Sequence, residues 1–577
     1  MVSRIIGSFL LGLCFRRASY VQAQGADLYL GDINFVILTD MHGFVKGTQN
    51  DPNLDADYGS VLSFVSQMRS ISTSLDQDVF YINNGDFVSG SGFSGNPPTA
   101  LTPIMEKFPW DLINIGEHEI SHRETVEFLL QPGGFVDWWE GRVLTSNIVL
   151  AGTDTPMGSR YRFIDGENWG SVVLALGFLY NFEGAPADLL EVIPVEDVIL
   201  SDWFTSVVLG EDRDYDGILV MAHMDIEDEL IGKILRRIRD LTSDYDMPVT
   251  FVAGHTHYRA YKKLDDYSSA IEAGGYMDTV GFISSHNVGE VLPNTTELFH
   301  HSFLDTNKEF LRATLNVTVL DTAEGQGLSE FIEEIEKSLG LQDYIGCAPT
   351  TYKKEAEMST KDSLTGLYFN EVIPQHVPNW NTTGDLFILG SKEFEYGILE
   401  GEVLRNDLQI VVPTQDAIVK LGDDIPGWVI LSLKNLEDSE KAPNSILPDF
   451  LWSREADDLE LFDTYTVYTG ESYVRAMSEV MNIALSGSAG NPTEIKNVTI
   501  KSIVFDYVEA NWVVCSSSSS KSMSGGQKAG ISIGVMAGVC CFCILCLFLR
   551  KQRKEDEFNQ HYDDAFEPEQ NGEANYT

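Results

Sequence analysis

The sequence has few basic residues for its length. Its 577 residues include 39 Lys and Arg against 87 Asp and Glu, which gives a formal net charge of −48 at pH 7. A chain this acidic is repelled by polyanions at long range, so DNA, RNA and anionic membrane surfaces are disfavoured as partners unless a local basic patch overrides the field. The short basic run at 550–554 is the one such patch. We therefore expect no nucleic acid polymer among the partners.

The sequence also lacks internal repeats and the low hydrophobicity of a disordered chain. Hydrophobic residues make up 43% of it and aromatic residues 11%. That composition is sufficient for buried cores, and at roughly 150 residues per domain the length leaves room for about three globular units. The composition therefore predicts a multidomain globular protein.

Long apolar runs are confined to the two ends of the chain. Residues 1–24 begin with Arg4 and a short apolar stretch, which is typical of a secretory signal peptide; the alternative is an uncleaved anchor. Residues 529–549 contain no charge and have the length of a membrane-spanning helix; the alternative is a buried globular helix. Because the basic run 550–554 follows directly, we expect a type I single-pass protein of the secretory pathway, at the cell surface or in an endomembrane lumen.

Cysteine is scarce between these two segments. Of the seven cysteines, Cys14 lies in the predicted signal, four lie in the predicted span, and only Cys347 and Cys515 remain. These two could form a disulfide in an oxidising lumen, or they could be free thiols. Glycosylation is expected at four sequons, Asn294, Asn316, Asn381 and Asn497. Small residues at four-residue spacing within the span suggest a weak homodimer contact through Gly530, Gly534 and Gly538.

Short apolar runs alternate with helix-like segments between residues 25 and about 325, as in a layered α/β domain. The runs predicted to be buried strands are 35–39, 79–82, 111–115, 217–221 and 249–253. Residues 327–342 have helical periodicity and are expected to lead into a second unit. In that unit we expect a strand at 427–432 and a helix at 471–485.

Each predicted strand of the first unit ends in a polar cluster rich in metal-ligand side chains. The clusters are Asp40-Met-His42, Gly85-Asp86, Gly116-Glu117-His118, Ala222-His223 and Gly254-His255-Thr-His257. Since α/β sheets place ligand sites at the carboxyl ends of strands, we expect these side chains to meet. The alternative for each histidine taken alone is a structural role.

The order of these clusters resembles that of the calcineurin-like metallophosphoesterases, which carry Asp-x-His, Gly-Asp, Gly-Asn-His, His and Gly-His-x-His. The segments Asn83–Ser91 and Ile271–Tyr276 are similar to the 5′-nucleotidase branch. The resemblance implies an αββα-layered metallophosphoesterase domain, a linker helix, a smaller α/β 5′-nucleotidase C-terminal-like domain and one transmembrane helix. The implied boundaries are signal peptide 1–24, metallophosphoesterase domain 25–326, linker helix 327–348, C-terminal-like domain 349–512, stalk 513–528, transmembrane helix 529–549 and cytoplasmic tail 550–577.

The resemblance also implies two divalent ions, Zn, Mn or Fe, and a small phosphorylated substrate. One ion would be bound by Asp40, His42 and His257, the other by Glu117, His223 and His255, and Asp86 would bridge them. His118 would protonate the leaving oxygen or stabilise charge in the transition state, so His118 and Asp86 are the expected catalytic residues.

Two positions depart from the family pattern, and both add negative charge. Position 117 is Glu where the family has Asn. In the second unit, Leu389–Tyr396 is the best counterpart of a family segment that supplies an arginine to the phosphate, and Glu395 falls on that arginine. A carboxylate in place of the arginine guanidinium removes the group that would bind the phosphate and repels the phosphate dianion.

Three functional readings follow from these observations. The first is a membrane-anchored extracytoplasmic metal-dependent phosphoesterase that hydrolyses phosphate esters, nucleotides among them. The second is a catalytically impaired member that acts as a surface binding or receptor-like protein. The third keeps hydrolysis but not nucleotide specificity. The first is favoured, and the sequence identifies no substrate-binding residue.

Overall fold

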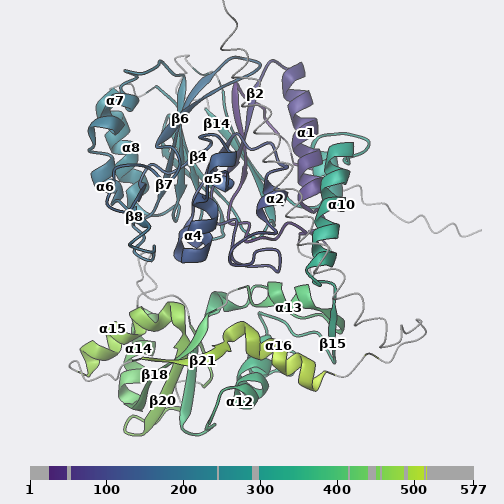
Figure 1. Cartoon of the computed structure of the whole chain (residues 1–577), viewed down its shortest axis with the longest axis vertical. Coiled ribbons are helices and arrows are strands. Elements are labelled where there is room, and N and C mark those ends of the chain that lie inside the picture. Colours follow the sequence, from purple (N-terminus) through teal and green to yellow (C-terminus); the bar gives the residue numbers. More distant parts are fainter. Residues whose placement is uncertain are drawn as a thin grey trace, which may run out of the picture.

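The structure, a computed structural model, describes residues 25–512 and Cys515. Within that range it omits 27, 48–52, 243–245, 287, 289–297, 414–415, 440–449, 455–457 and 486–491. The predicted signal peptide, transmembrane helix with its glycines, and cytoplasmic tail lie outside the described residues, as does nearly all of the stalk. Among the residues described, no helix is long and apolar enough to cross a membrane. Figure 1 shows two α/β units, one formed by the purple-to-teal elements and one by the green-to-yellow elements.

Two six-stranded sheets form the first unit. In spatial order, the first sheet contains β14 (Phe299–Asp305), β13 (Thr279–Ser285), β1 (Ile33–Leu38), β2 (Asp78–Asn83), β3 (Leu112–Asn114) and β4 (Val143–Leu144). The second contains β11 (Arg259–Asp265), β12 (Ser268–Ala273), β10 (Val249–Ala253), β9 (Gly217–His223), β7 (Val172–Leu179) and β6 (Tyr161–Asp165). A separate pair is formed by β5 (Ile148–Leu150) and β8 (Leu190–Val192). The five strands predicted for this unit correspond to β1, β2, β3, β9 and β10.

Strand β1 shows why the sheets stack face to face. Its residues Ile33, Phe35 and Ile37 join a buried cluster shared with the second sheet, whereas Val36 and Leu38 join the cluster beneath the outer helices. Successive side chains of a strand point to opposite faces, so β1, whose residues are all buried, is covered on both sides. The unit is therefore layered helix, sheet, sheet, helix.

Helices cover both outer faces. The first sheet is covered chiefly by α1 (Tyr58–Ser74) and α10 (Ala323–Ser338), which lie side by side (Figure 1). A Cβ on Gly59 would lie 2.3 Å from the Gly325 carbonyl oxygen, so only glycine allows the two helices to pack this closely. The second sheet is covered by α6 (Val195–Val198), α7 (Asp202–Val208) and α8 (Glu229–Thr242). The other helices are α2 (Thr102–Met105), α3 (Glu117–Ser121), α4 (Arg123–Leu130), α5 (Phe135–Trp138) and α9 (Lys308–Thr314).

The second unit has a five-stranded sheet and a two-stranded sheet. The first contains β19 (Phe450–Trp452), β16 (Asp385–Gly390), β20 (Thr464–Gly470), β18 (Ala417–Pro426) and β21 (Thr493–Thr499); the second contains β15 (Tyr344–Ala348) and β17 (Gly401–Leu404). Its α-helices are α11 (Leu364–Leu367), α12 (Ile373–His376), α13 (Arg405–Val411), α14 (Gly427–Ser439), α15 (Val474–Ala484) and α16 (Ile500–Asn511). Short helical turns occur at Tyr368–Val372, Ser391–Glu393 and Glu471–Tyr473. Cys347 and Cys515 form a disulfide.

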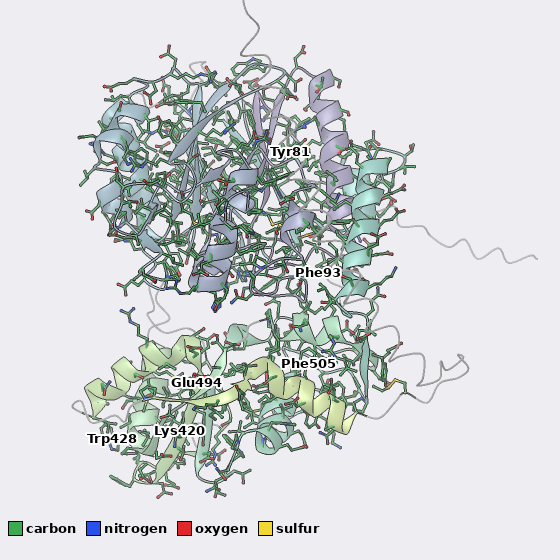
Figure 2. All side chains as sticks on the ribbon, in the orientation of Figure 1. Tyr81, Phe93, Lys420, Trp428, Glu494 and Phe505 are labelled. Atoms are coloured by element: carbon green, nitrogen blue, oxygen red, sulfur yellow. A yellow bond between two sulfur atoms is a disulfide. The ribbon has the colours of Figure 1, made fainter. Side chains whose placement is uncertain are left out.

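The predicted strand at 427–432 is wrong, because this segment begins helix α14. Its apolar run has the β-branched composition of a strand, but Val429, Ile430 and Leu433 are buried together in the core at helical spacing. Trp428 lies on the other side of the helix, 39% exposed, and Figure 2 shows it at the outer side of the second unit. A short apolar run is compatible with both the two-residue period of a strand and the 3.6-residue period of a helix. Here packing against the sheet favours the helix.

The linker helix also differs from its predicted range. Helix α10 begins at Ala323, where Thr322 accepts a hydrogen bond from the Gly325 N–H, and it ends at Ser338. Gly340 follows with a φ of 65°, which stops the helix, and residues 344–348 form β15. The helix around 471–485 is present as the turn Glu471–Tyr473 followed by α15.

Candidate metal centre

The polar clusters meet at the carboxyl ends of strands from both sheets. Strands β1, β2 and β3 run parallel to one another, as do β9 and β10, so the loops that follow them lie at one edge. Ligand-type atoms within 4.8 Å of one another form three groups: Asp40 with His42 and His257; Asp86 with Glu117, His223 and His255; and His42 with Asp86 and His118. Every residue predicted to bind metal or act in catalysis is in at least one of these groups, and Asp86 and His42 each occur in two.

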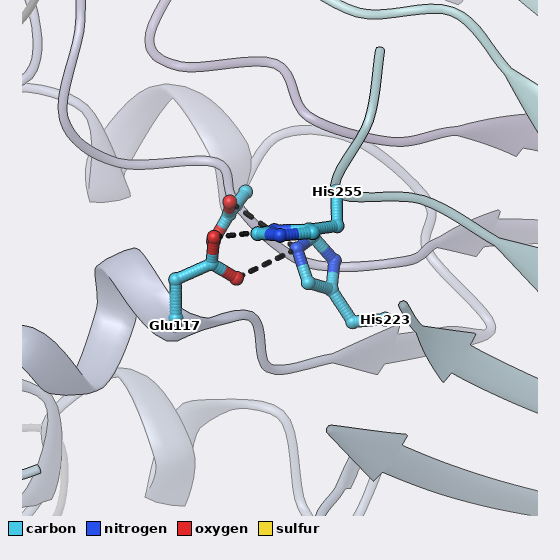
Figure 3. Close-up of side chains that lie close together, drawn as sticks. Glu117, His223 and His255 are labelled. Carbon is cyan, nitrogen blue, oxygen red and sulfur yellow. Dashed lines mark ion pairs between the residues drawn. The ribbon is translucent and has the colours of Figure 1, made fainter. Parts of the chain in front are cut away.

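Glu117, the position that departs from the family pattern, faces the imidazoles of His223 and His255 (Figure 3). Its Oε2 is 3.1 Å from His223 Nε2, and its Oε1 is 2.6 Å from His255 Nδ1. Asp86 Oδ2 is 3.2 Å from the same His223 nitrogen. Glutamate thus reaches the cluster in spite of its extra methylene.

Four buried atoms in this group have no hydrogen-bond partner although they face one another. They are Asp86 Oδ2, Glu117 Oε2, His223 Nε2 and His255 Nδ1. Buried polar atoms are nearly always satisfied, and one cation held between these four atoms would satisfy all of them in addition to the ion-pair contacts they make with one another. Carboxylate oxygen with imidazole nitrogen and no thiolate is a donor set that fits Zn, Mn or Fe.

Hydrogen bonds to carbonyl oxygens fix which nitrogen of two histidines is free to bind a cation. His42 Nδ1 donates to the carbonyl oxygens of Ser89 at 2.8 Å and Val88 at 3.1 Å, and His223 Nδ1 donates to that of Asn84 at 2.7 Å. A carbonyl only accepts, so Nδ1 carries the proton and Nε2 presents a lone pair. His42 Nε2 faces His257 Nε2 at 3.1 Å, which suits a shared cation.

The backbone at these residues is in a conformation that side-chain-bearing residues rarely adopt. Asp40, His42, Asp86, His255 and His257 have φ values of 51°, 46°, 49°, 76° and 63°. Positive φ costs a non-glycine residue about 1 kcal/mol or more and persists only where the surroundings impose it. The concentration of this strain at one strand edge is typical of a functional site.

Burial disfavours the charged forms of two side chains in the cluster, Asp40 and His42. It raises the pKa of Asp40 to about 7 and lowers that of His42 to about 4. Burial also opposes ionisation of Glu117, but His255 and His223 beside it hold its pKa well below the usual range. Glu117 is therefore anionic, and its negative charge belongs to the site.

Sequence analysis did not identify Glu119, which holds two of the site loops together. Its carboxylate accepts hydrogen bonds from the backbone N–H groups of Asp86, Phe87, Val88 and Gly116, at 2.8, 2.9, 3.0 and 2.8 Å. Burial and Asp86 raise its pKa to about 8, and these donors oppose that rise. A signal was present, because Glu119 stands three residues after Gly116, the capping-box position of α3.

Glu272 was also missed and has a similar role in the second sheet. It is fully buried on β12, and its Oε1 accepts hydrogen bonds from Thr256 Oγ1 and from the Tyr258 N–H. These partners lie within the loop that carries His255 and His257. Glu272 lies within Ile271–Tyr276, a segment that carries part of the resemblance, but no sequence feature indicates that it accepts these hydrogen bonds.

Glu395 of the second unit lies close to the metal-ligand cluster through Tyr276. The Tyr276 ring is 5.1 Å from that of His42 and 4.7 Å from that of His257. Burial, and after it Glu395, raises the pKa of Tyr276. The carboxylate of Glu395 is 21% exposed and 3.6 Å from Lys354 Nζ. No ion pair at the metal-ligand groups includes Lys or Arg among the described residues.

Three of the predicted glycosylation sites are exposed, Asn316, Asn381 and Asn497. Asn294 lies outside the described residues. Exposure is compatible with glycosylation, which stays a prediction.

Comparison with known proteins supports the resemblance at the level of the fold. No family model matches the chain. An uncharacterized protein of Saccharomyces cerevisiae is 26% identical over 407 residues, covering 67% of each chain, and a protein of Arthroderma benhamiae described as a secreted protein is 24% identical over 440 residues, covering 68% of this chain and 65% of that protein. The chain thus spans about two thirds of the length of these relatives.

A solved structure gives the stronger likeness. The crystal structure of a 5′-nucleotidase from Candida albicans superposes with a TM-score of 0.74 at 22% identity, covering 84% of this chain and 99% of that one. The chain therefore has the two-unit α/β fold of this 5′-nucleotidase, which confirms the predicted resemblance at the level of the fold.

Proposed function

We propose that this chain is a metal-dependent phosphoesterase. The observation that carries the proposal is the convergence of four buried ligand atoms, from Asp86, Glu117, His223 and His255, within 4.8 Å of one another. Asp40, His42 and His257 would hold a second cation, with Asp86 between the two. Bound divalent cations would supply Lewis-acid stabilisation of charge at phosphorus and would lower the pKa of water.

His118 is the residue proposed to act on the leaving group. Its backbone N–H donates to Asp86 Oδ1 at 3.0 Å, which fixes the start of α3, while its ring is 34% exposed and faces the ring of His42 at 5.0 Å. Its Nε2 is 3.9 Å from Asp86 Oδ2. A half-exposed imidazole beside the cluster can reach a substrate oxygen and transfer a proton to it.

A second candidate function, an impaired enzyme retained as a binding protein, is favoured by the charge of the site. Glu117 is anionic within the cluster, and Glu395 adds negative charge on the side of the second unit. Both weaken attraction for a phosphate dianion. A third candidate, a phosphoesterase with a substrate other than a nucleotide, keeps hydrolysis but not nucleotide specificity.

Location outside the cytoplasm, anchored by residues 529–549, is part of the proposal and rests on the apolar run and the basic residues that follow it. The relative described as secreted is consistent with the secretory pathway.

The experiment is a panel of phosphate monoesters and diesters, including nucleotides, assayed on the full chain with added Mn or Zn. The phosphoesterase proposal expects turnover that His118→Ala and Asp86→Ala abolish. Bound metal without turnover on any ester would reject it in favour of a binding protein, and gain of turnover on Glu117→Asn would add support to that second candidate.

A further inference from the structure

A buried lysine of the second unit donates to the loop that orients a metal ligand in the first. Lys501 lies on α16 and is 6% exposed. Its ammonium donates to the carbonyl oxygen of Pro413 at 2.9 Å, to Gln409 Oε1 at 3.0 Å and to the carbonyl oxygen of Gly90 at 3.4 Å. Two acceptors belong to the second unit and the third to the first, so all three ammonium hydrogens are used across the boundary.

Gly90 lies in the loop that follows Asp86. Three hydrogen bonds join this segment to His42. The His42 N–H donates to the Asp86 carbonyl at 3.0 Å, the Ser91 N–H donates to the His42 carbonyl at 2.9 Å, and His42 Nδ1 donates to the Ser89 carbonyl at 2.8 Å. A Cβ on Gly90 would lie 2.4 Å from the His42 carbonyl oxygen. A shift of Gly90 must therefore shift His42.

The same loop packs against the second unit next to this contact. A Cβ on Gly92 would meet the side chain of Leu341 at 2.3 Å and that of Asn406 at 3.2 Å. Figure 2 shows Phe93 at the side of the first unit that faces the second. The loop that carries Asp86 and orients His42 thus forms part of the boundary between the units.

An apolar side chain would fill the position of Lys501 without the desolvation that a buried amine requires. Burial lowers the pKa of Lys501 to about 7, and Glu393 opposes that shift. The amine is kept because it satisfies acceptors that an apolar residue would leave unpaired, and one of them is the carbonyl of Gly90.

We propose that Lys501 is a positioning residue for His42, and that it couples docking of the second unit to cation binding by Asp40, His42 and His257. The inference rests on the metal centre proposed above. Coupling is reciprocal, so a cation bound at His42 must strengthen the docking of α16 by the same factor that docking strengthens cation binding.

The variant experiment compares Lys501→Met with Lys496→Met in the full chain. Lys496 is an exposed residue of β21, so it controls for loss of a charge close by in the sequence. Co²⁺ titration followed by visible absorption should show two binding events in the wild type. In Lys501→Met one of them should weaken by about tenfold, the loss expected for an outer partner of a metal ligand, while Lys496→Met binds as the wild type does.

The reciprocal experiment needs no variant. Saturating Co²⁺ should slow hydrogen exchange in α16 and in residues 88–91 of the wild-type protein, because bound cation holds the loop against Lys501. This measurement keeps the inference testable where Lys501→Met fails to fold.

The possible results distinguish failure of the coupling through Lys501 from failure of the proposed metal centre. A wild-type protein that binds no Co²⁺ overturns both the metal centre and this inference. Two unchanged binding events in folded Lys501→Met, or α16 exchange that does not respond to Co²⁺ in the wild type, overturns the coupling alone and leaves the phosphoesterase proposal standing.

Discussion

The metal-ligand cluster of the first unit and the Leu389–Tyr396 segment of the second differ in how closely they keep the family pattern. In the cluster, imidazoles and carboxylates converge on shared points, and even Glu117 reaches its place. In the segment, Glu395 falls on the position for which the resemblance implies an arginine, and Lys354 is its neighbour. On the proposed function, cation binding and phosphate recognition would reside in different units, so that one could change while the other is kept.

The largest effect should come from removing Asp86, the side chain proposed to be shared between the two ligand sets. Asp86→Ala would take away one ligand atom from each set, so turnover of any ester that the wild type hydrolyses should fall by at least about a thousandfold, or about 4 kcal/mol in the barrier. Steady-state assays measure this. Asp188→Ala, an exposed residue paired with Arg123, is the control and should be unchanged. Comparable rates for the two variants would show that the cluster is not the catalytic centre.

The next largest effect is expected at Glu119, which holds the loops of the metal-ligand cluster together. Glu119→Ala leaves four buried N–H groups without an acceptor, and each buried unsatisfied donor costs about 1 kcal/mol or more. We expect the free energy of unfolding of the metal-free protein to fall by about 3 kcal/mol or more, measured by urea denaturation. Glu124→Ala on exposed α4 should change it by less than about 0.5 kcal/mol. A similarly small loss for Glu119→Ala would contradict the scaffold role.

Charge within the cluster should influence phosphate binding more modestly. Glu117→Asn removes one negative charge from a buried position, so inorganic phosphate should bind the metal-loaded protein about tenfold more tightly, or about 1.4 kcal/mol. Calorimetry measures this, with the metal content of both proteins determined first. Glu127→Gln, exposed on α4, is the control for loss of a charge. Unchanged or weaker phosphate binding by Glu117→Asn would mean that Glu117 does not limit access of the dianion.

The smallest effect is expected in the second unit. Glu395 is partly exposed, so solvent screens its charge, and Glu395→Gln should tighten phosphate binding by less than about 1 kcal/mol. Glu400→Gln, an exposed neighbour in the sequence, should have no effect in the same titration. If Glu395→Gln exceeded Glu117→Asn, the contrast between the units would be reversed, and the second unit would dominate phosphate recognition.

The position of the metal-ligand clusters at the carboxyl ends of the strands could be predicted from the sequence, because each cluster follows an apolar run. Asp40 comes two residues after β1, and His223 is the last residue of β9. Helix α14 could not be predicted, since its apolar run has the composition of a strand and only packing sets its period. Glu272 and Lys501 could not be found either. Their partners are distant in sequence, and burial of a charged side chain depends on the whole fold.

We expect the carboxyl-end edge of the first unit's strands to hold two cations with Asp86 between them. Anomalous diffraction from crystals grown with Mn or Zn would locate such cations. We expect two peaks about 3.5 to 4 Å apart, one beside His42 and His257 and the other beside Glu117, His223 and His255. No anomalous peak at these residues in crystals grown with saturating metal would contradict it.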